Sequence, residues 1–274
     1  MLWNARNGCI KFGDTDMDCI RFGTGEKVLV MLPGLGDGLR TMKGTAIPFA
    51  AMYRMFAKDF TVYAFSRKNK IPVGYTTRDM AKDLMIAMKA LGIPKAHIFG
   101  VSMGGMIAQH FAADYPEMVD KLVLTVTCAR PTPELIGAVT KWMAQAEKED
   151  HRALMDSNVR LIYTDAYYRR SKWSIPLVAA VTKPKSYERF LRQAESCLTH
   201  YAYDRLDRIR AKTLVIGGEE DQCLGGAASR EIADRIPGAQ LKMYPGQGHG
   251  LYEEVKEFNR VVLGFLKGEA DAAN

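Results

Sequence analysis

The feature that most constrains the fold is a series of short, continuous apolar runs separated by stretches with helical periodicity. Runs of four or five residues suit strands covered on both faces, and they occur at Val28–Leu32, Thr61–Phe65, His97–Val101, Leu122–Val126, Thr213–Ile216 and Gln240–Tyr244. Helical patterns occupy Thr77–Leu91, the residues after Ser102, Ala227–Ile236 and Glu253–Leu266. Strands that alternate with helices predict an α/β fold, with a mainly parallel sheet flanked by helices on both sides.

Two further segments depart from this alternation. Cys9–Phe12 and Met17–Phe22 flank turn-forming residues and are expected to form an opening β-hairpin. Residues 130–208 are helical in character, and prolines are expected to divide them into about four helices. An insertion between two strands is the simplest account. We therefore predict the first part of an α/β core at 1–129, a helical cap at 130–208 and the second part of the core at 209–274.

Composition excludes several classes of function. The chain has 274 residues and a formal charge of +7, but Lys and Arg are interleaved with Asp and Glu, so no nucleic-acid partner is expected. Its five cysteines lack a C-x-x-C spacing, which argues against a zinc site. The first residues do not resemble a signal peptide, and no apolar run approaches the ~20 residues that span a bilayer. We expect a cytoplasmic protein with no membrane partner.

The clearest chemical motif is Gly100-Val101-Ser102-Met103-Gly104, which matches the G-x-S-x-G pattern of a nucleophilic serine on a strand-to-helix turn. An apolar strand run directly precedes it and a helical segment directly follows it, as that pattern requires. The glycines are needed because a strained serine backbone brings its neighbours close to the adjoining strand and helix. The alternative is an ordinary serine in a chance strand–turn–helix.

A serine hydroxyl needs a base to take its proton, so one of the five histidines should lie within hydrogen-bond reach. His97 begins the strand that Ser102 follows, roughly 16 Å away, and His110 lies roughly 12 Å along the following helix. His151 and His200 fall in the insertion, where packing or surface roles are the default, although His200 could line a pocket. His249 remains, in a glycine-flanked loop beyond the last strand run.

The base needs a carboxylate to orient it. Between Ser102 and His249, the acidic cluster directly after a strand run is Glu219-Glu220-Asp221. Asp221 is preferred because it lies furthest past the end of the strand. The preceding strand run is followed by Thr127 and Cys128, so that position offers no acid.

Acyl transfer also needs donors aimed at the developing oxyanion. The backbone N–H of Met103, directly after the serine, is one candidate. The second should come from the glycine-rich loop at residues 33–38, where Leu35 N–H is preferred and Gly36 N–H is the alternative. These glycines could also merely form a tight turn.

Together these motifs resemble the α/β-hydrolase superfamily, specifically its capped branch of small esterases, lactonases and carbon–carbon bond hydrolases. Leu32–Gly36 resembles the family's oxyanion loop, Gly100–Gly105 its nucleophile turn, Gly218–Asp221 its acid turn and Gly246–His249 its histidine loop. The chain departs from the family pattern at two places. Pro33 replaces the histidine that commonly begins the oxyanion loop, and a basic segment at 66–70 replaces an acidic loop, which hints at anionic substrates.

The leading hypothesis is a serine hydrolase of small-molecule carboxylic esters that uses Ser102, Asp221 and His249 and needs no metal or organic cofactor. A carbon–carbon bond hydrolase of a vinylogous diketone, a lactonase and an acyltransferase are the enzymatic alternatives, and a ligand receptor on the same fold is the non-enzymatic one. The pocket is expected to be mainly apolar, and the sequence makes no prediction of oligomeric state. Its candidate substrate contacts are Gly34, Leu35, Met103, Trp142, Trp173 and Leu251.

Overall fold

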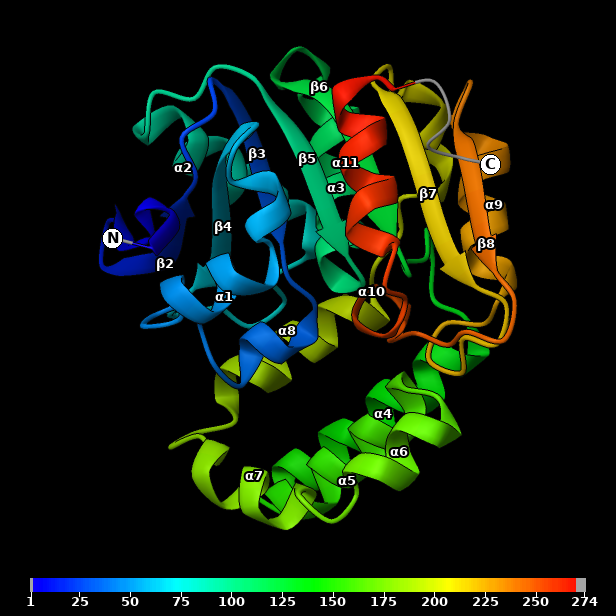
Figure 1. The fold of residues 1–274 in the computed structure, drawn as a ribbon. Coiled ribbons are helices and arrows are strands. Elements are labelled where there is room, and N and C mark those ends of the chain that lie inside the picture. Colours follow the sequence, from blue (N-terminus) through cyan, green and yellow to red (C-terminus); the bar gives the residue numbers. More distant parts are fainter. Residues whose placement is uncertain (1, 270–274) are drawn as a thin grey trace.

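A single eight-stranded sheet organises the chain in the computed structural model, which describes residues 2–269. The strand order is β1-β2-β4-β3-β5-β6-β7-β8 (Figure 1). The pairs β1–β2 and β2–β4 are antiparallel, and all later neighbours are parallel. The predicted α/β fold with a mainly parallel sheet is therefore confirmed.

Each predicted strand run forms a strand, with ends that differ by a few residues. The strands are β1 (Arg6–Phe12), β2 (Thr15–Phe22), β3 (Lys27–Leu32), β4 (Phe60–Lys68), β5 (Ala96–Val101), β6 (Val119–Thr125), β7 (Lys212–Gly218) and β8 (Gln240–Tyr244). The central strand β5 is buried along its whole length, as its continuous apolar character requires. β1 and β2 form the predicted hairpin at one edge.

Helices cover both faces of the sheet and enclose two apolar cores. One core lies under α2 (Thr77–Ala90), α3 (Met103–Asp114) and α9 (Ala227–Arg235), and the other under α1 (Ala46–Met52) and α11 (Phe258–Lys267). The structure also contains short 3-10 helices, which are η1 (Leu2–Asn4), η2 (Leu35–Gly38), η3 (Arg54–Phe56), η4 (Pro116–Met118) and η5 (Tyr203–Arg208). A Thr76–Asp79 capping box begins α2.

The prediction of a single helix at Glu253–Leu266 is wrong, because the structure has two helices in this region. α10 spans Leu251–Glu254, and α11 begins at Phe258 after the extended backbone of Val255. No glycine or proline marks the break in the sequence. The turn instead allows Leu251 and Phe258 to be buried at the same time in the second core.

The insertion between β6 and β7 is helical, as predicted, but contains five helices rather than about four. They are α4 (Pro133–Glu147), α5 (His151–Ile162), α6 (Asp165–Ser171), α7 (Ile175–Thr182) and α8 (Glu188–Leu198). Pro133 and Pro176 lie in the first turns of α4 and α7, where proline is well tolerated. We call this layer the cap, because it lies across the end of the sheet where β3 and β5 finish (Figure 1). Within residues 2–269, no helix is long and apolar enough to cross a membrane.

Candidate active site

Ser102 lies in the sharp turn between β5 and α3. Its backbone has φ 54° and ψ −121°, a left-handed-side conformation that few residues other than glycine adopt. The turn is held by Ser102 N–H, which donates to Thr125 O on β6, and by Ser102 O, which accepts from the N–H groups of Gly105 and Met106. The serine hydroxyl is thereby fixed at the carboxyl edge of the sheet.

The glycines of this turn are required by close packing. A Cβ on Gly104 would overlap Leu32 O of the adjacent strand, and one on Gly105 would lie 2.6 Å from Thr127 Cβ. A Cβ on Gly100 would lie 2.5 Å from Gly104 O. The sequence G-x-S-x-G-G is therefore the one that lets β5 and α3 meet at so sharp an angle.

His249 and Asp221 reach Ser102 from loops after β8 and β7. His249 Nε2 lies 3.0 Å from Ser102 Oγ, and His249 Nδ1 lies 2.8 Å from Asp221 Oδ2. The two loops pack tightly, since a Cβ on Gly218 would lie 2.6 Å from Gly248 O. Residues separated by 147 positions thus form one continuous hydrogen-bonded chain.

The environment of Asp221 keeps its carboxylate ionised. Burial by itself raises the pKa of Asp221, but the His249 imidazole lowers it, and so do two backbone donors, for a net value below the ordinary one. Those donors are Cys223 N–H at 2.8 Å and Leu224 N–H at 3.0 Å, both to Oδ1. An ionised Asp221 accepts a hydrogen bond from the Nδ1–H of His249, which keeps the proton on Nδ1 and leaves Nε2 as the acceptor for the serine hydroxyl.

Backbone donors flank the serine on two sides. Within residues 2–269, the N–H groups of Leu35, Gly36 and Met103 donate to no protein acceptor. Met103 N–H belongs to the first turn of α3, where helical N–H groups lack intrahelical partners. The loop that carries Leu35 lies against the serine, because a Cβ on Gly34 would be 3.9 Å from Ser102 Oγ. An oxygen anion beside Ser102 could be stabilised from both directions.

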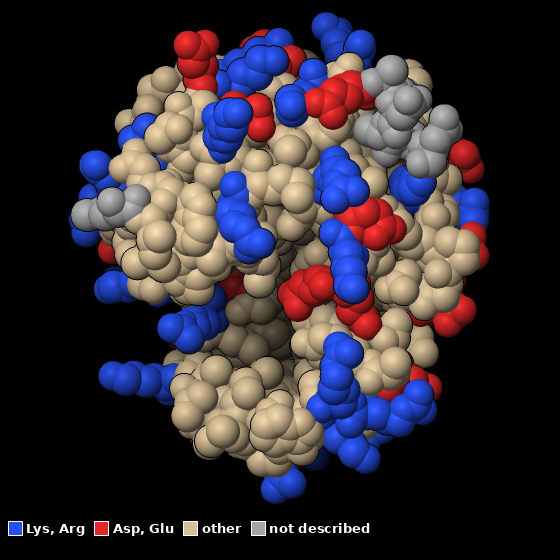
Figure 2. All heavy atoms as spheres, in the orientation of Figure 1, with Lys and Arg blue, Asp and Glu red and all other residues tan. Residues whose placement is uncertain are grey.

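A cavity of about 410 Å³ opens onto Ser102 and His249 from beneath the cap. Figure 2 shows the hollow between the cap and the core. The lining is largely apolar and comes from η2, from α4, α5 and α8, and from the loops of His249 and Asp221; among the lining residues are Leu35, Met106, Leu135, Val139, Trp142, Leu154, Phe190, Cys197, Leu224 and Tyr252. This volume suits a ligand of small to moderate size.

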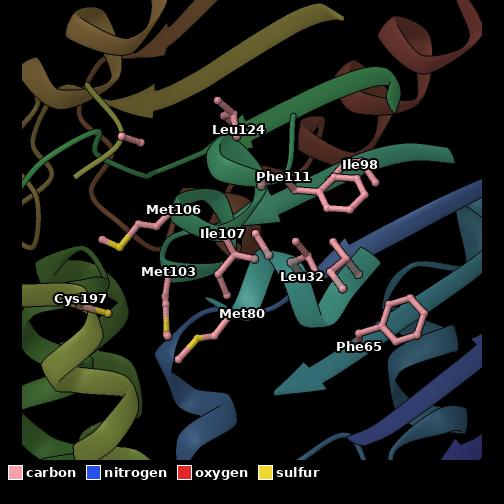
Figure 3. Packing of buried hydrophobic residues seen from close by; sticks show 14 of the residues in the cluster. Leu32, Phe65, Met80, Ile98, Met103, Met106, Ile107, Phe111, Leu124 and Cys197 are labelled. Atoms are coloured by element: carbon pink, nitrogen blue, oxygen red, sulfur yellow. The ribbon is translucent and has the colours of Figure 1, made fainter. Parts of the chain in front are cut away.

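The predicted substrate contacts divide into two groups. Gly34, Leu35 and Trp142 line the cavity. Met103 does not, because its side chain is buried in the core among α2 and α3 (Figure 3). Leu251 is likewise buried beneath the site, and its neighbour Tyr252 lines the cavity instead. Trp173 is 77% exposed on the outer side of the cap, so it is not a cavity residue.

Leu135 and Val139 are lining residues that the sequence analysis missed. Together with Trp142 they recur at i, i+4 and i+7 on α4, so helical periodicity could have identified them.

The basic segment at 66–70 is used within the protein. Arg67 is buried, its Nη1 lies 4.0 Å from Asp37 Oδ2, and its Nη2 donates to Pro33 O. Lys68 Nζ lies 3.2 Å from Asp83 Oδ1. Arg67 therefore stabilises the loop at residues 33–38, and Lys68 is paired with Asp83 of α2. Neither cation supports the hint of anionic substrates.

The other histidines make no contact with Ser102 within residues 2–269, and one of them lines the cavity. His97 lies 3.4 Å from Asp120 at the opposite edge of the sheet, and His110 and His200 pack edge-to-face with ring centroids 5.1 Å apart. His200 Nδ1 lies 2.8 Å from Thr77 Oγ1, so it does not line the cavity. His151 on α5 does line it, on the cap side.

The fold and this site define a hydrolase of the α/β class. A sequence profile of the family described as alpha/beta hydrolase fold matches residues 27–255, and the chain belongs to that family. The match includes the serine turn, the acid turn and the histidine loop.

Individual relatives are similar along most of their length. The chain is 27% identical over 199 residues to a putative carbamate hydrolase RutD of Caulobacter sp. (strain K31), covering 72% of this chain and 74% of that protein. It is 28% identical over 264 residues to 2-hydroxy-6-oxo-6-phenylhexa-2,4-dienoate hydrolase of Burkholderia cepacia, covering 89% and 88%. Among solved structures, MGS-M2, an alpha/beta hydrolase enzyme from a Medee basin deep-sea metagenome library, matches with a TM-score of 0.81 at 26% identity, covering 95% and 97%.

Proposed function

We propose that the protein hydrolyses small-molecule carboxylic esters through an acyl-enzyme, with Ser102 as nucleophile, His249 as general base and Asp221 as its orienting carboxylate. The observation that carries the proposal is the hydrogen-bonded chain from Ser102 Oγ through His249 to Asp221, opening into a cavity. A binding protein would have no physical need for a serine in this chain.

The proposed reaction has two stages, formation of an acyl-enzyme and its hydrolysis. Ser102 Oγ attacks the carbonyl carbon while His249 Nε2 takes its proton, and the tetrahedral oxyanion accepts hydrogen bonds from the N–H groups of Leu35 and Met103. His249 then protonates the departing alcohol and leaves an acyl group on Ser102. A water molecule, deprotonated by His249, releases the acid and restores the serine.

The cavity favours neutral, largely apolar esters. Its walls are built from Leu, Val, Met, Trp and Phe side chains, which match an acyl chain better than a charged group. Beside the serine, Asp37 lines the cavity but is paired with Arg67 and Arg189. Asp37 is therefore not free to bind a charged group of the substrate.

Carbon–carbon bond hydrolysis is a second candidate, and Arg40 favours it. The Burkholderia cepacia relative acts, by its name, on a dienoate, which carries a carboxylate. Among the described residues 2–269, Arg40 is the one Lys or Arg that lines the cavity, and its exposed side chain could bind such a group.

A fluorophosphonate probe tests the nucleophile. We expect the wild-type protein to be labelled and Ser102→Ala to be unlabelled, because the probe bonds to an activated serine oxygen. Equal labelling of both proteins would overturn the proposal.

A substrate panel tests the bond that is cleaved. p-Nitrophenyl esters of increasing acyl length should be hydrolysed, with an optimum set by the cavity, and a vinylogous diketone should be a poorer substrate. A preference for the diketone, abolished by Arg40→Ala, would favour carbon–carbon cleavage instead.

A further inference from the structure

The outer side of the cap carries an apolar surface that no part of the described chain covers. It consists of Trp173, Leu177, Val178 and Val181, whose side chains are exposed, three of them by 66% or more. Leu177 and Val181 are four residues apart on α7, so they share one side of the helix, and Trp173 lies in the turn directly before it. We call these four residues the α7 patch.

Helix α7 is apolar on both of its sides. Ile175 and Ala179 are buried toward the cap, whereas Leu177 and Val181 face outward. All of its residues except Thr182 are apolar. A helix that is apolar all round normally lies in apolar surroundings, and contiguous apolar surface of this kind marks an interaction site.

Cations outnumber acids in the segment that carries the α7 patch, although one of them, Lys183, has its Nζ 3.9 Å from Glu149 Oε2. Residues 164–185 include five Lys or Arg and one acidic residue, Asp165. The cations, all exposed, are Arg169, Arg170, Lys172, Lys183 and Lys185. In Figure 2 the surface of the cap over α7 is tan, with Lys and Arg side chains around it. Apolar side chains that include a tryptophan and are flanked by cations complement a lipid surface, in which an apolar layer lies beneath anionic headgroups.

The patch adjoins the cavity. Thr182, the last residue of α7, lines the cavity, and its Oγ1 lies 3.1 Å from Nε2 of the lining residue His151. The α7 patch and the cavity therefore share the C-terminal end of α7 as a boundary.

We propose that the α7 patch docks the protein onto an anionic lipid surface. Such docking needs no spanning helix, since the apolar side chains enter only the boundary between headgroups and acyl chains. A second copy of the chain fits less well, because a two-fold contact through this patch would bring the flanking cations of the two copies close together. The docking does not depend on the proposed function. The uptake of lipid-derived esters into the cavity by the docked protein does depend on it.

Vesicle sedimentation tests the docking. We expect the wild-type protein to sediment with phosphatidylcholine vesicles containing about 30 mol% phosphatidylglycerol, to bind pure phosphatidylcholine weakly and to be released by about 0.5 M salt. Leu177→Asp/Val181→Asp should weaken binding by about tenfold or more. The matched control, Ile47→Asp/Val73→Asp, changes two exposed apolar residues of the core, at 55% and 76% exposure, and should bind within about twofold of wild type.

Tryptophan fluorescence gives a second readout. Trp173 emission should shift to shorter wavelength on vesicle binding, and Trp173→Phe should lose the shift while still sedimenting. Equal binding by the Leu177→Asp/Val181→Asp and control variants would overturn the proposal, as would no binding to the anionic vesicles. A wild-type dimer that the α7 variant converts to a monomer would assign the patch to a second copy instead.

Hydrolysis of soluble p-nitrophenyl butyrate, measured in parallel, separates the two proposals. The α7 variant should retain this activity. Vesicle binding without any ester hydrolysis would leave the docking intact and overturn the proposed function alone.

Discussion

Arg189 of the cap binds Asp37 of the core with Nη2 2.6 Å from Oδ2, two residues beyond the proposed oxyanion donor Leu35. The same guanidinium donates to Asp37 O, to Arg67 O and to Lys68 O. Burial by itself raises the pKa of Asp37, but Arg189 and Arg67 lower it below its usual value. Helix α8 of the cap therefore holds the loop that carries Leu35, one of the two proposed oxyanion donors.

Loss of the Arg189–Asp37 ion pair should reduce both the free energy of unfolding and the rate of turnover. Arg189→Ala leaves a buried carboxylate with a weaker partner, which should cost about 3 kcal/mol of unfolding free energy, and displacement of Leu35 should lower kcat more than it changes KM. Urea unfolding and ester kinetics measure the two effects. Arg160→Ala, which breaks the exposed pair with Asp156, is the control and should cost under about 0.5 kcal/mol.

The orienting role of Asp221 predicts a large kinetic effect with little structural change. Asp221→Asn keeps the shape but no longer favours the proton on His249 Nδ1, so kcat should fall by about 10⁴-fold. Glu220→Gln alters the adjacent exposed acid and should leave kcat nearly unchanged. Similar losses in both variants would contradict the assignment of the acid.

The close packing of the turn around Ser102 predicts that even a methyl group at Gly105 is too large. Gly105→Ala would place a Cβ 2.6 Å from Thr127 Cβ and should destabilise the fold by about 1–3 kcal/mol. Gly137→Ala, in α4, meets no atom within 4 Å and should stabilise it by up to about 1 kcal/mol. Thermal unfolding of the pair checks the prediction, which fails if the two changes have the same sign.

Buried histidines predict a loss of stability in acid. Burial, with a smaller contribution from Arg205, lowers the pKa of His110 from 6.5 to about 4, and burial lowers that of His200 as well. Between pH 4 and pH 6.5 the unfolded chain binds more protons at these histidines than the folded chain does. Their contribution to the free energy of unfolding is therefore fully present above pH 6.5 and falls as the pH drops toward 4.

Urea unfolding at pH 7 and at about pH 4.5 measures this effect, to which His110 should contribute about 2 kcal/mol. His110→Gln removes the titrating group, so the difference between the two pH values should shrink by that amount. An unchanged difference would show that other groups dominate.

Local sequence patterns determined the strands, the serine turn and the loops that carry the acid and the histidine. Apolar runs and glycine spacing act over a few residues, and a parallel sheet brings the loops after its strands to one edge. Ser102, Asp221 and His249 could therefore be predicted to meet.

Only the tertiary structure decided how the cap meets the core. Arg189 and Asp37 are 152 positions apart, and nothing near either residue signals their contact. The break at Val255 and the outward position of Trp173 likewise depend on which surfaces are already covered by distant segments. Burial is a property of the assembled molecule, so a helical pattern predicts that a helix forms, but the packing of its partners decides which side chains face the cavity and which face outward.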